Sequence, residues 1–425
     1  MPQIVPQTDR TTFAYLAWSL GALGFLYAWF HRVTPSVMVD HLMADFAVSG
    51  AVLGTLSSLY FYAYASLQLP VGAIVDRWGT RIPFACALLV AASGSALFAS
   101  AERIEWAYLG RILIGGGAAF AWVSVLKITA LHFPPSRFAM LSGAGMFIGL
   151  IGGFSGQVAA GAIVDAFGWR ATMWGLAVAG LGLAMAVWTL LNRHDQAVRR
   201  DAPPETIAAV LSGLRNVLRQ PRIWMVAGGG AIGAAPIFVF ASLWGVPFLM
   251  QTHGMTRPAA ASLTATMLIG WGFGAFLFGW ISDRLGQRRW PLLAGLLVAL
   301  LTLTAAIYLP GLPKLALGGL LAMAGLGSGA IILTYAMSGD LASHAARGSA
   351  YGFANMLVIL SGAVFQPFTG WLLDLNWSGK TVEGARLYDA ETYAAAFLVV
   401  PVTFAVAIAM IASSGQETSS ALKDT

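Results

Sequence analysis

Two basic residues stand inside long apolar stretches of the sequence, where a charge needs a chemical reason. Arg32 lies near the end of the first apolar stretch and Lys127 near the end of the fourth. A cation inside a membrane costs several kcal/mol unless it faces water or a partner. Every Asp and Glu lies at the end of a stretch, in a loop or in a tail, so we predict an anionic ligand as the missing partner. The alternative is that both cations reach the membrane interface or bond to carbonyl groups.

The residue before Arg32 is a histidine, which points to proton transfer. Small changes in the local field can switch the charge of an imidazole near neutral pH. Arg32 beside His31 disfavours the charged imidazolium form, and a bound anion would offset that effect. We therefore interpret His31 as a candidate proton-coupling group. Uniport or anion exchange without a titrating group is the alternative.

Further polar side chains occur in the apolar stretches. Tyr60, Tyr64 and Gln68 follow one another at four-residue intervals, so they fall on one face of a helix. A polar stripe of this kind is poorly suited to lipid and is expected to line a central cavity. The other candidate substrate contacts are Gln157, Gln366, Tyr335 and Asn355. Interhelical hydrogen bonds, or a place at the membrane interface for tyrosine, are the alternative roles.

The elements that hold these residues are expected to be membrane spans. Of the 425 residues, 58% are hydrophobic and 10% charged, with a mean hydropathy of +0.74, which is outside the range of soluble globular proteins. The single cysteine, Cys86, excludes an intramolecular disulfide, and the scattered histidines predict no metal site. No nucleophile, histidine and acid are grouped at a catalytic spacing, so we predict neither enzymatic activity nor a cofactor. The excess of basic charge fits membrane orientation rather than nucleic-acid binding.

The apolar stretches are long enough to cross a bilayer, which takes roughly 20 helical residues. Twelve spans fall near residues 12–37, 50–73, 82–101, 106–130, 138–163, 169–192, 223–249, 258–281, 290–309, 313–339, 348–373 and 392–413. Placing both termini in the cytoplasm puts most loop Lys and Arg on the cytoplasmic side, as the positive-inside rule requires. We predict a monomeric, multi-pass protein of a bacterial inner (plasma) membrane, with the lipid bilayer and a small molecule as its partners.

A short motif recurs four times and divides the chain into related units. Its copies begin at Gly72, Gly161, Gly279 and Gly370, and each has an aspartate four residues later. The two copies within each half begin 89 and 91 residues apart, and the first copies of the two halves begin 207 residues apart. Internal repeats of this kind are typical of transporters. We predict an N-terminal six-helix bundle over 1–192, a linker with an amphipathic helix over 193–222, a C-terminal six-helix bundle over 223–414 and a polar tail over 415–425.

The chain resembles the major facilitator superfamily in the loop Gly72-Ala-Ile-Val-Asp-Arg-Trp-Gly79-Thr-Arg81, which recurs from Gly279 to Arg288 in a twelve-span chain. The resemblance implies two pseudo-symmetric six-helix bundles and a gate in which the loop Asp pairs with an Arg at the start of a neighbouring helix. By resemblance the gating residues are Gly72, Asp76, Arg77, Gly79, Arg81, Arg137, Asp283, Arg284, Gly286 and Arg347, with the pairs Asp76–Arg137 and Asp283–Arg347. The alternative is that these charges merely fix the topology. We expect Gly72 to permit close helix approach, and Gly79 and Gly286 to permit tight turns.

A narrower resemblance, to the anion:cation symporter branch and its organophosphate relatives, begins at Phe30-His31-Arg32-Val-Thr-Pro-Ser36. In that branch an Arg in the first helix holds an anionic substrate, which implies the same role for Arg32 and an auxiliary role for Lys127. The branch commonly places an acid beside this Arg, where the present chain has His31. We predict secondary transport of a small organic anion by alternating access. Transport of zwitterionic or neutral solutes, efflux of drugs or metabolites, and a receptor or scaffold that transports nothing are the alternatives.

Overall fold

The computed structural model describes residues 7–191, 207–343 and 346–415, and these are almost entirely helical. The first half comprises α1 (Gln7–Val33), η1 (Thr34–Val37), α2 (Val39–Phe46), α3 (Gly50–Trp78), α4 (Arg81–Ala99), α5 (Ile104–His132) and α6 (Pro135–Leu190). The remainder comprises α7 (Ile207–Leu218), α8 (Pro221–Pro236), η3 (Ile237–Trp244), α9 (Gly245–His253), α10 (Arg257–Leu285), α11 (Arg289–Tyr308), α12 (Lys314–Ser328), η4 (Gly329–Ile331), α13 (Ile332–Leu341), α14 (Arg347–Leu375), β1 (Thr381–Val382), β2 (Ala385–Arg386), α15 (Ala390–Ala396) and α16 (Val399–Ser413). The predicted all-α membrane fold is confirmed.

The lengths of the helices agree with the predicted spans. Among the described residues, 10 helices are long and apolar enough to cross a membrane, and the bent pair Val39–Phe46 with Gly50–Gln68 adds one more. α6 counts once here although it is 56 residues long. Gly168 interrupts it with φ 82° and ψ 164°, a conformation that costs glycine little. Dividing α6 at this kink yields the fifth and sixth of the twelve predicted spans.

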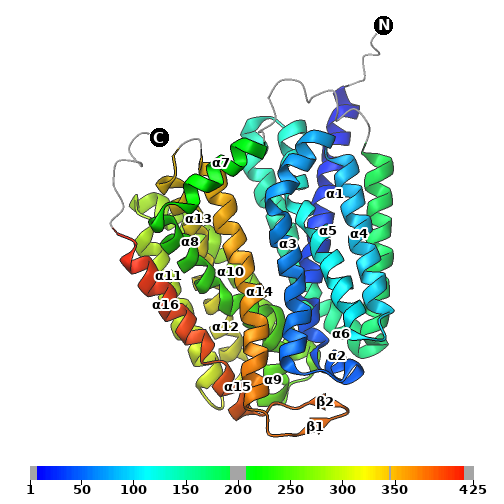
Figure 1. The fold of residues 1–425 in the computed structure, drawn as a ribbon, viewed down its shortest axis with the longest axis vertical. Coiled ribbons are helices and arrows are strands. Elements are labelled where there is room, and N and C mark those ends of the chain that lie inside the picture. The colour runs from blue at the N-terminus through cyan, green and yellow to red at the C-terminus, as the bar shows by residue number, and fades with distance from the viewer. Residues whose placement is uncertain (1–6, 192–206, 344–345, 416–425) are drawn as a thin grey trace.

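The helices form two bundles that stand side by side (Figure 1). One bundle contains α1 to α6 and the other α8 to α16. They contact each other mainly along α3 with α14 and along α6 with α10. These four helices carry the four copies of the repeated motif. The boundary near 192 and most of the tail fall in 192–206 and 416–425, outside the described residues, so the exact domain limits stay a prediction.

The two ends of the paired bundles differ (Figure 1). One end, called the hairpin end below, carries α2, α9, α15 and the antiparallel pair β1–β2, in which Thr381 lies opposite Arg386 and Val382 opposite Ala385. The other end, called the terminal end, carries α7, the start of α1 and the end of α16. The predicted gating residues belong to helix termini at the terminal end.

Two spans lose regular α-helical geometry towards the hairpin end. α1 passes into the 3-10 helix η1 at Pro35, which has no N–H to give to the carbonyl of residue 31. In the second bundle, Pro236 precedes the wide π-helical segment η3, a geometry that is common at functional sites. η1 and η3 contact each other. The irregular segments of the two bundles therefore meet between the halves.

The amphipathic helix predicted in the linker is present as α7. Val217 is fully buried in a cluster with Ala350 and Phe353 of α14. A side chain at Gly213 would come within 2.5 Å of Ser349 Oγ. α7 thus packs on the second bundle at the terminal end, where a helix that only lay on the membrane surface would make no such contact.

Candidate functional site

Arg32 lies buried in a cage of aromatic rings. Its side chain is 4% exposed, and its Cζ lies 4.3 Å from the ring centre of Trp29, 5.2 Å from that of Tyr64 and 5.7 Å from that of Tyr60. Trp29 sits one turn earlier on α1, and the two tyrosine rings stack on each other on α3. Cation–π attraction to several desolvated rings holds a guanidinium in place, each contact contributing on the order of 1–2 kcal/mol.

The rings attract the Arg32 charge but leave hydrogen-bonding capacity unused. Among the described residues no carboxylate pairs with Arg32, and its Nε is buried without a hydrogen-bond partner. A guanidinium has five N–H donors in a planar fork that matches carboxylate and phosphate groups. The arrangement can therefore accept an anion.

A chain of hydrogen bonds joins the two bundles beside this cage. Asn355 Nδ2 on α14 donates to Gln68 Oε1 on α3 at 3.1 Å, and the Tyr335 hydroxyl on α13 donates to Asn355 Oδ1 at 3.3 Å. Gln68 follows Tyr64, whose ring faces Arg32, by one turn of α3. Side chains far apart in the sequence thus come together with Arg32 at the interface, as the substrate-contact prediction requires.

The two glutamines of the predicted set lie at η3. Gln157 Nε2 donates to the carbonyl of Ala241, and Gln366 Nε2 donates to that of Phe238 at 2.8 Å. Both side chains are fully buried, and one comes from each bundle. They form interhelical hydrogen bonds to carbonyls of the π-helical segment, which was the alternative role. Their contact with a substrate stays a prediction.

His31 is enclosed within the first bundle. Its side chain is 1% exposed, its ring meets Tyr27 edge-on at 4.6 Å, and its Nε2 lies 3.2 Å from Ser95 Oγ. The Ser95 hydroxyl also donates to the Ala91 carbonyl at 2.9 Å, so Ser95 Oγ is able to accept from Nε2 in the tautomer that carries its hydrogen there. Nδ1 is left as a buried acceptor without a partner.

Comparison with known proteins identifies the family. A model described as Major Facilitator Superfamily matches residues 20–246 and 226–414, nearly the whole of both bundles. The chain belongs to the Major Facilitator Superfamily. It is a multi-pass membrane protein with a transporter fold and not an enzyme.

Several curated members of the superfamily align with the chain. The uncharacterized transporter YybO of Bacillus subtilis is 24% identical, over 62% of this chain and 63% of its own length, so part of that relative is not spanned. The gallate transporter of Pseudomonas putida is 25% identical over 66% of this chain and 69% of its own length. The hexuronate transporter of Bacillus subtilis is 23% identical over 81% and 84%.

Solved structures share the same superfamily fold. A bacterial homologue of the human lysosomal transporter Spinster, described as inward-facing and unoccupied, superposes with a TM-score of 0.75 at 18% identity, covering 95% of each chain. The nucleoside transporter NupG, solved as a point mutant, superposes with a TM-score of 0.77 at 14% identity, covering 94% of this chain and all of that one.

One superfamily gating residue meets an unexpected partner at the terminal end. Lys127 Nζ donates to Asp76 Oδ1 at 2.5 Å, and Arg137 Nη1 donates to the Tyr15 hydroxyl at 3.0 Å. The expectation that Lys127 lacks a carboxylate was wrong, because α5 brings its last turns against the end of α3. Lys127 is ion-paired within the first bundle in this conformation, and its auxiliary role in anion binding stays a prediction.

The other terminal-end gating residues are arranged as follows. Arg81 Nε donates to the Trp188 carbonyl at 2.8 Å, Arg284 lies over the Trp280 ring at 4.4 Å, and Arg77 is exposed. Among the described residues no ion pair joins Asp283 to Arg347, whereas Arg288 pairs with Asp340 at 2.8 Å. The predicted gating pairs therefore stay predictions for another state of the transporter.

The glycines of the motif divide into two groups. Gly79 and Gly286 have φ of 76° and 61°, which confirms the predicted turns. A side chain at Gly72 would meet no atom within 4 Å. The expected close helix approach there was wrong in this conformation, because no helix in the described part of the chain comes within 4 Å of a Cβ at this position.

At the hairpin end a clamp joins the bundles through Arg257, the first residue of α10. Its guanidinium makes a bidentate pair with Asp40 of α2 at 2.7 Å for each contact, and its Nε donates to Asp165 of α6 at 2.5 Å. It also donates to the carbonyl of Val37 at 2.9 Å. Such charge-assisted, bidentate bonds are the strong ones. The second bundle is thereby held to the first at three points.

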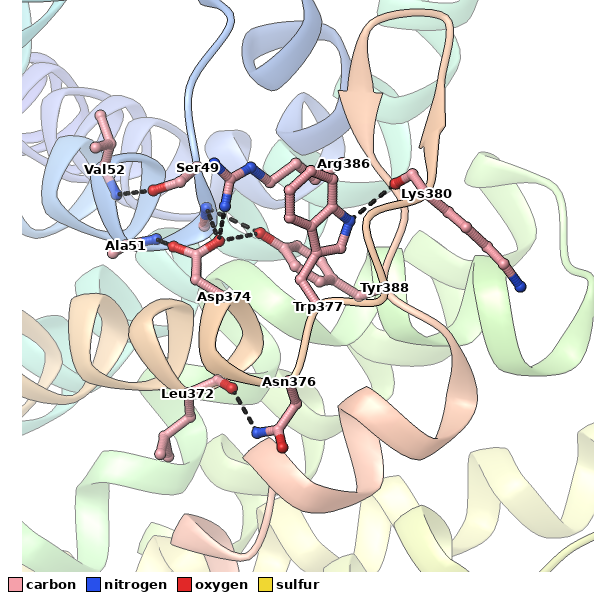
Figure 2. A network of polar contacts seen from close by, with 11 residues as sticks. Ser49, Ala51, Val52, Leu372, Asp374, Asn376, Trp377, Lys380, Arg386 and Tyr388 are labelled. Atoms are coloured by element: carbon pink, nitrogen blue, oxygen red, sulfur yellow. Dashed lines mark hydrogen bonds and ion pairs between the residues drawn. The ribbon is translucent and has the colours of Figure 1, made fainter.

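A second contact at the hairpin end involves Asp374, the aspartate of the fourth motif copy (Figure 2). Its carboxylate accepts from the backbone N–H groups of Gly50 and Ala51, at 3.0 and 2.8 Å, where α3 begins in the other bundle. The Arg386 guanidinium and the Tyr388 hydroxyl also donate to it, at 3.0 and 2.6 Å. Burial, and then the bond to Asp374, raises the pKa of Tyr388, so this phenol remains a donor.

The sequence interpretation missed several of these residues. Trp29 has the ring nearest to Arg32, and its spacing of three residues on the same helix was a usable signal. Asp165 and Asp374 occupy the aspartate position of motif copies two and four, so the repeat itself marked them. Asp40 and Arg257 lie far apart in sequence, and nothing in their local patterns pairs them.

Proposed function

We propose that this chain is a secondary transporter that moves a small organic anion by alternating access, with Arg32 as the anchor of the anion. The observation that carries the proposal is the buried Arg32 guanidinium, which faces three rings and has an Nε without a partner. Tyr64 on α3 faces Arg32, and Gln68 one turn further along α3 is joined to Asn355 and Tyr335 of the other bundle. A site shared between halves changes shape when the halves rock.

The names of relatives support an anionic substrate. Gallate and hexuronate, the compounds named for two of them, both carry a carboxylate. A carboxylate bound to Arg32 would form charge-assisted, bidentate hydrogen bonds with its guanidinium. These bonds would compensate the cost of burying the Arg32 charge.

We assign the terminal end to the cytoplasm of a bacterial inner membrane, on the basis of the loop Lys and Arg, and propose a monomeric transporter. The hairpin end then faces outwards and is held shut by the Arg257 and Asp374 contacts. At the terminal end, Lys127 and Asp76 pair within one bundle. This combination supports a state of the transport cycle that is closed to the outside.

Proton coupling through His31 is a further part of the proposal. In the empty site Arg32, Arg111 and burial beside Tyr27 all oppose the charged imidazolium. A bound anion next to Arg32 would reduce that opposition, and the free Nδ1 is the atom that can receive the proton. Anion and proton would then be carried together.

The test is a thermal-shift screen of the purified protein with glucuronate, gallate, glucose 6-phosphate, an amino acid and a neutral drug. A ligand at 100 times its Kd stabilises the folded protein by about 2.7 kcal/mol. We expect at least one of the anions to raise the melting temperature of the wild type and not that of Arg32→Ala. The matched control is Arg103→Ala, an exposed arginine between α4 and α5, which should respond like the wild type.

Two results would contradict the anion proposal. In the first, only neutral or zwitterionic compounds stabilise the protein, which favours transport of neutral solutes or efflux. In the second, Arg32→Ala responds to the anion as fully as the wild type, and Arg32 then serves helix packing. An anion that binds but shows no flux into liposomes would favour a receptor or scaffold.

A further inference from the structure

Arg111 on α5 is a second buried guanidinium close to the Arg32 cage. It is 2% exposed, and its Cζ lies 5.1 Å from the centre of the Tyr60 ring, which also faces Arg32. Among the described residues no carboxylate pairs with it. An arginine near the start of a span commonly reaches the membrane interface, whereas this one is buried inside the bundle. A buried charge of this kind persists only when its donors are satisfied.

Backbone carbonyls accept from both terminal nitrogens of Arg111 in place of a carboxylate, while its Nε, like that of Arg32, is buried without a partner. Its Nη1 donates to the carbonyl of His31 at 3.0 Å, and its Nη2 to that of Ser57 at 3.4 Å. In a continuous helix the carbonyl of residue 31 would receive the N–H of residue 35, but that residue is Pro35 and has none. Arg111 therefore supplies to α1 the hydrogen bond that Pro35 withholds.

The position of Arg111 itself is fixed by close packing of α5 on α3. Gly115 lies one turn further along α5, and a side chain there would come within 2.3 Å of the Tyr60 carbonyl. The absence of a side chain lets the two backbones approach. The guanidinium thus projects from a rigid base towards the last turn of α1.

We propose that Arg111 is a positioning residue for anion binding. By holding the carbonyl of residue 31 it fixes the turn of α1 that carries Arg32, and so directs the Arg32 guanidinium between Trp29 and Tyr64. The inference rests on the proposed function of Arg32. Unlike Arg32, Arg111 has both terminal nitrogens engaged by carbonyls, so we assign it no direct contact with the anion.

The test compares Arg111→Met with the double variant Pro35→Ala/Arg111→Met. Methionine keeps an apolar stem and removes all donors, and we expect it to weaken binding of glucuronate, gallate or glucose 6-phosphate about tenfold, measured as Kd for each anion that protects the wild type. Pro35→Ala returns an N–H to the carbonyl of residue 31, so the double variant should recover most of the affinity. If Arg111 acted only through its positive charge, the double variant would bind the anion as weakly as Arg111→Met, since both lack that charge.

The control is Arg103→Met, which removes an exposed arginine near the start of the same helix and should bind like the wild type. Should Arg111→Met not fold, Arg111→Lys with and without Pro35→Ala makes the same comparison, because one ammonium cannot reproduce the two-carbonyl fork. Unchanged affinity in the single variant, or no recovery in the double variant, would overturn the inference and leave Arg32 as anchor. If no anion protects the wild type, the proposed function fails and this inference fails with it.

Discussion

At the level of single residues, the buried cations differ in what compensates their charge. Arg32 faces three rings, Arg111 donates from both terminal nitrogens to carbonyls, and Lys127 pairs with the Asp76 carboxylate. The Nε of each arginine is buried without a partner. A compensated cation gains little from a ligand, because its solvation has already been replaced. Arg32 is therefore the cation of the three that an anion would stabilise most.

The pH dependence of transport is a prediction for one residue, His31. In liposomes, His31→Gln should transport the anion with a rate that no longer changes between about pH 5 and 8, the range in which histidine titrates. Glutamine can still donate to Ser95, so the packing of the site is kept. The measurement is anion uptake at a series of pH values. A pH profile identical to the wild type would exclude His31 and leave uniport or anion exchange.

At the level of elements, motif copies two and four act at the hairpin end. Asp165 lies three residues before the Gly168 kink of α6 and accepts from Arg257 at the start of α10. Asp374 lies in the last turn of α14 and accepts from backbone N–H groups at the start of α3. Backbone N–H groups at a helix start favour a negative charge. A side chain at Gly370 would come within 2.2 Å of the Gly50 carbonyl, so this contact also depends on close backbone approach.

Asp374→Asn tests this hairpin-end contact. Asparagine keeps the shape of the side chain but removes the negative charge that the start of α3 and Arg386 stabilise. We expect the closed state to lose about 1–2 kcal/mol of stability, which raises the ratio of open to closed states about tenfold. In a Cys86→Ser background, spin labels at Ser100→Cys and Lys380→Cys should report a longer mean distance across the hairpin end. Glu383→Gln, an exposed acid in the same hairpin, is the control. Equal distance distributions in both variants would remove Asp374 from the gate.

At the level of the whole molecule, side-chain contacts hold the two bundles together at the hairpin end. α2 of the first bundle lies beside the β1–β2 hairpin of the second, and a side chain atom at Gly384 would lie 3.7 Å from Ala44 Cβ. That spacing suits a disulfide. If the halves must separate here during transport, a covalent bond at this point arrests the cycle.

The variant Ala44→Cys/Gly384→Cys, in a Cys86→Ser background, places a disulfide between the two bundles at this point. Oxidation should stop anion flux into liposomes, and reduction should restore it. Gly384 has φ of 86°, so cysteine there costs roughly 1–3 kcal/mol of strain, and each single cysteine variant serves as the control. Flux that continues at the unoxidised rate in the fully crosslinked protein would rule out opening at the hairpin end.

The sequence by itself determined the membrane fold and the candidate anchor. Span length, loop charge and the motif repeat are local properties, and they led to twelve helices in two bundles. Arg32 could be singled out because a charge in an apolar run is costly wherever the chain places it. The tight turns at Gly79 and Gly286 were also predictable, since a positive φ is a local property that glycine adopts at little cost.

Only the tertiary structure decided which groups neutralise one another. The pairing of Lys127 with Asp76, of Arg257 with Asp40 and Asp165, and of Asp374 with the start of α3 joins residues between about 50 and 325 positions apart. Such contacts depend on how the helices pack and on the state of the transport cycle, and no periodic pattern in the sequence encodes either of these. For the same reason Arg111, alike in sequence to any arginine near the start of a span, acquired its partners only when α5 met α1 and α3.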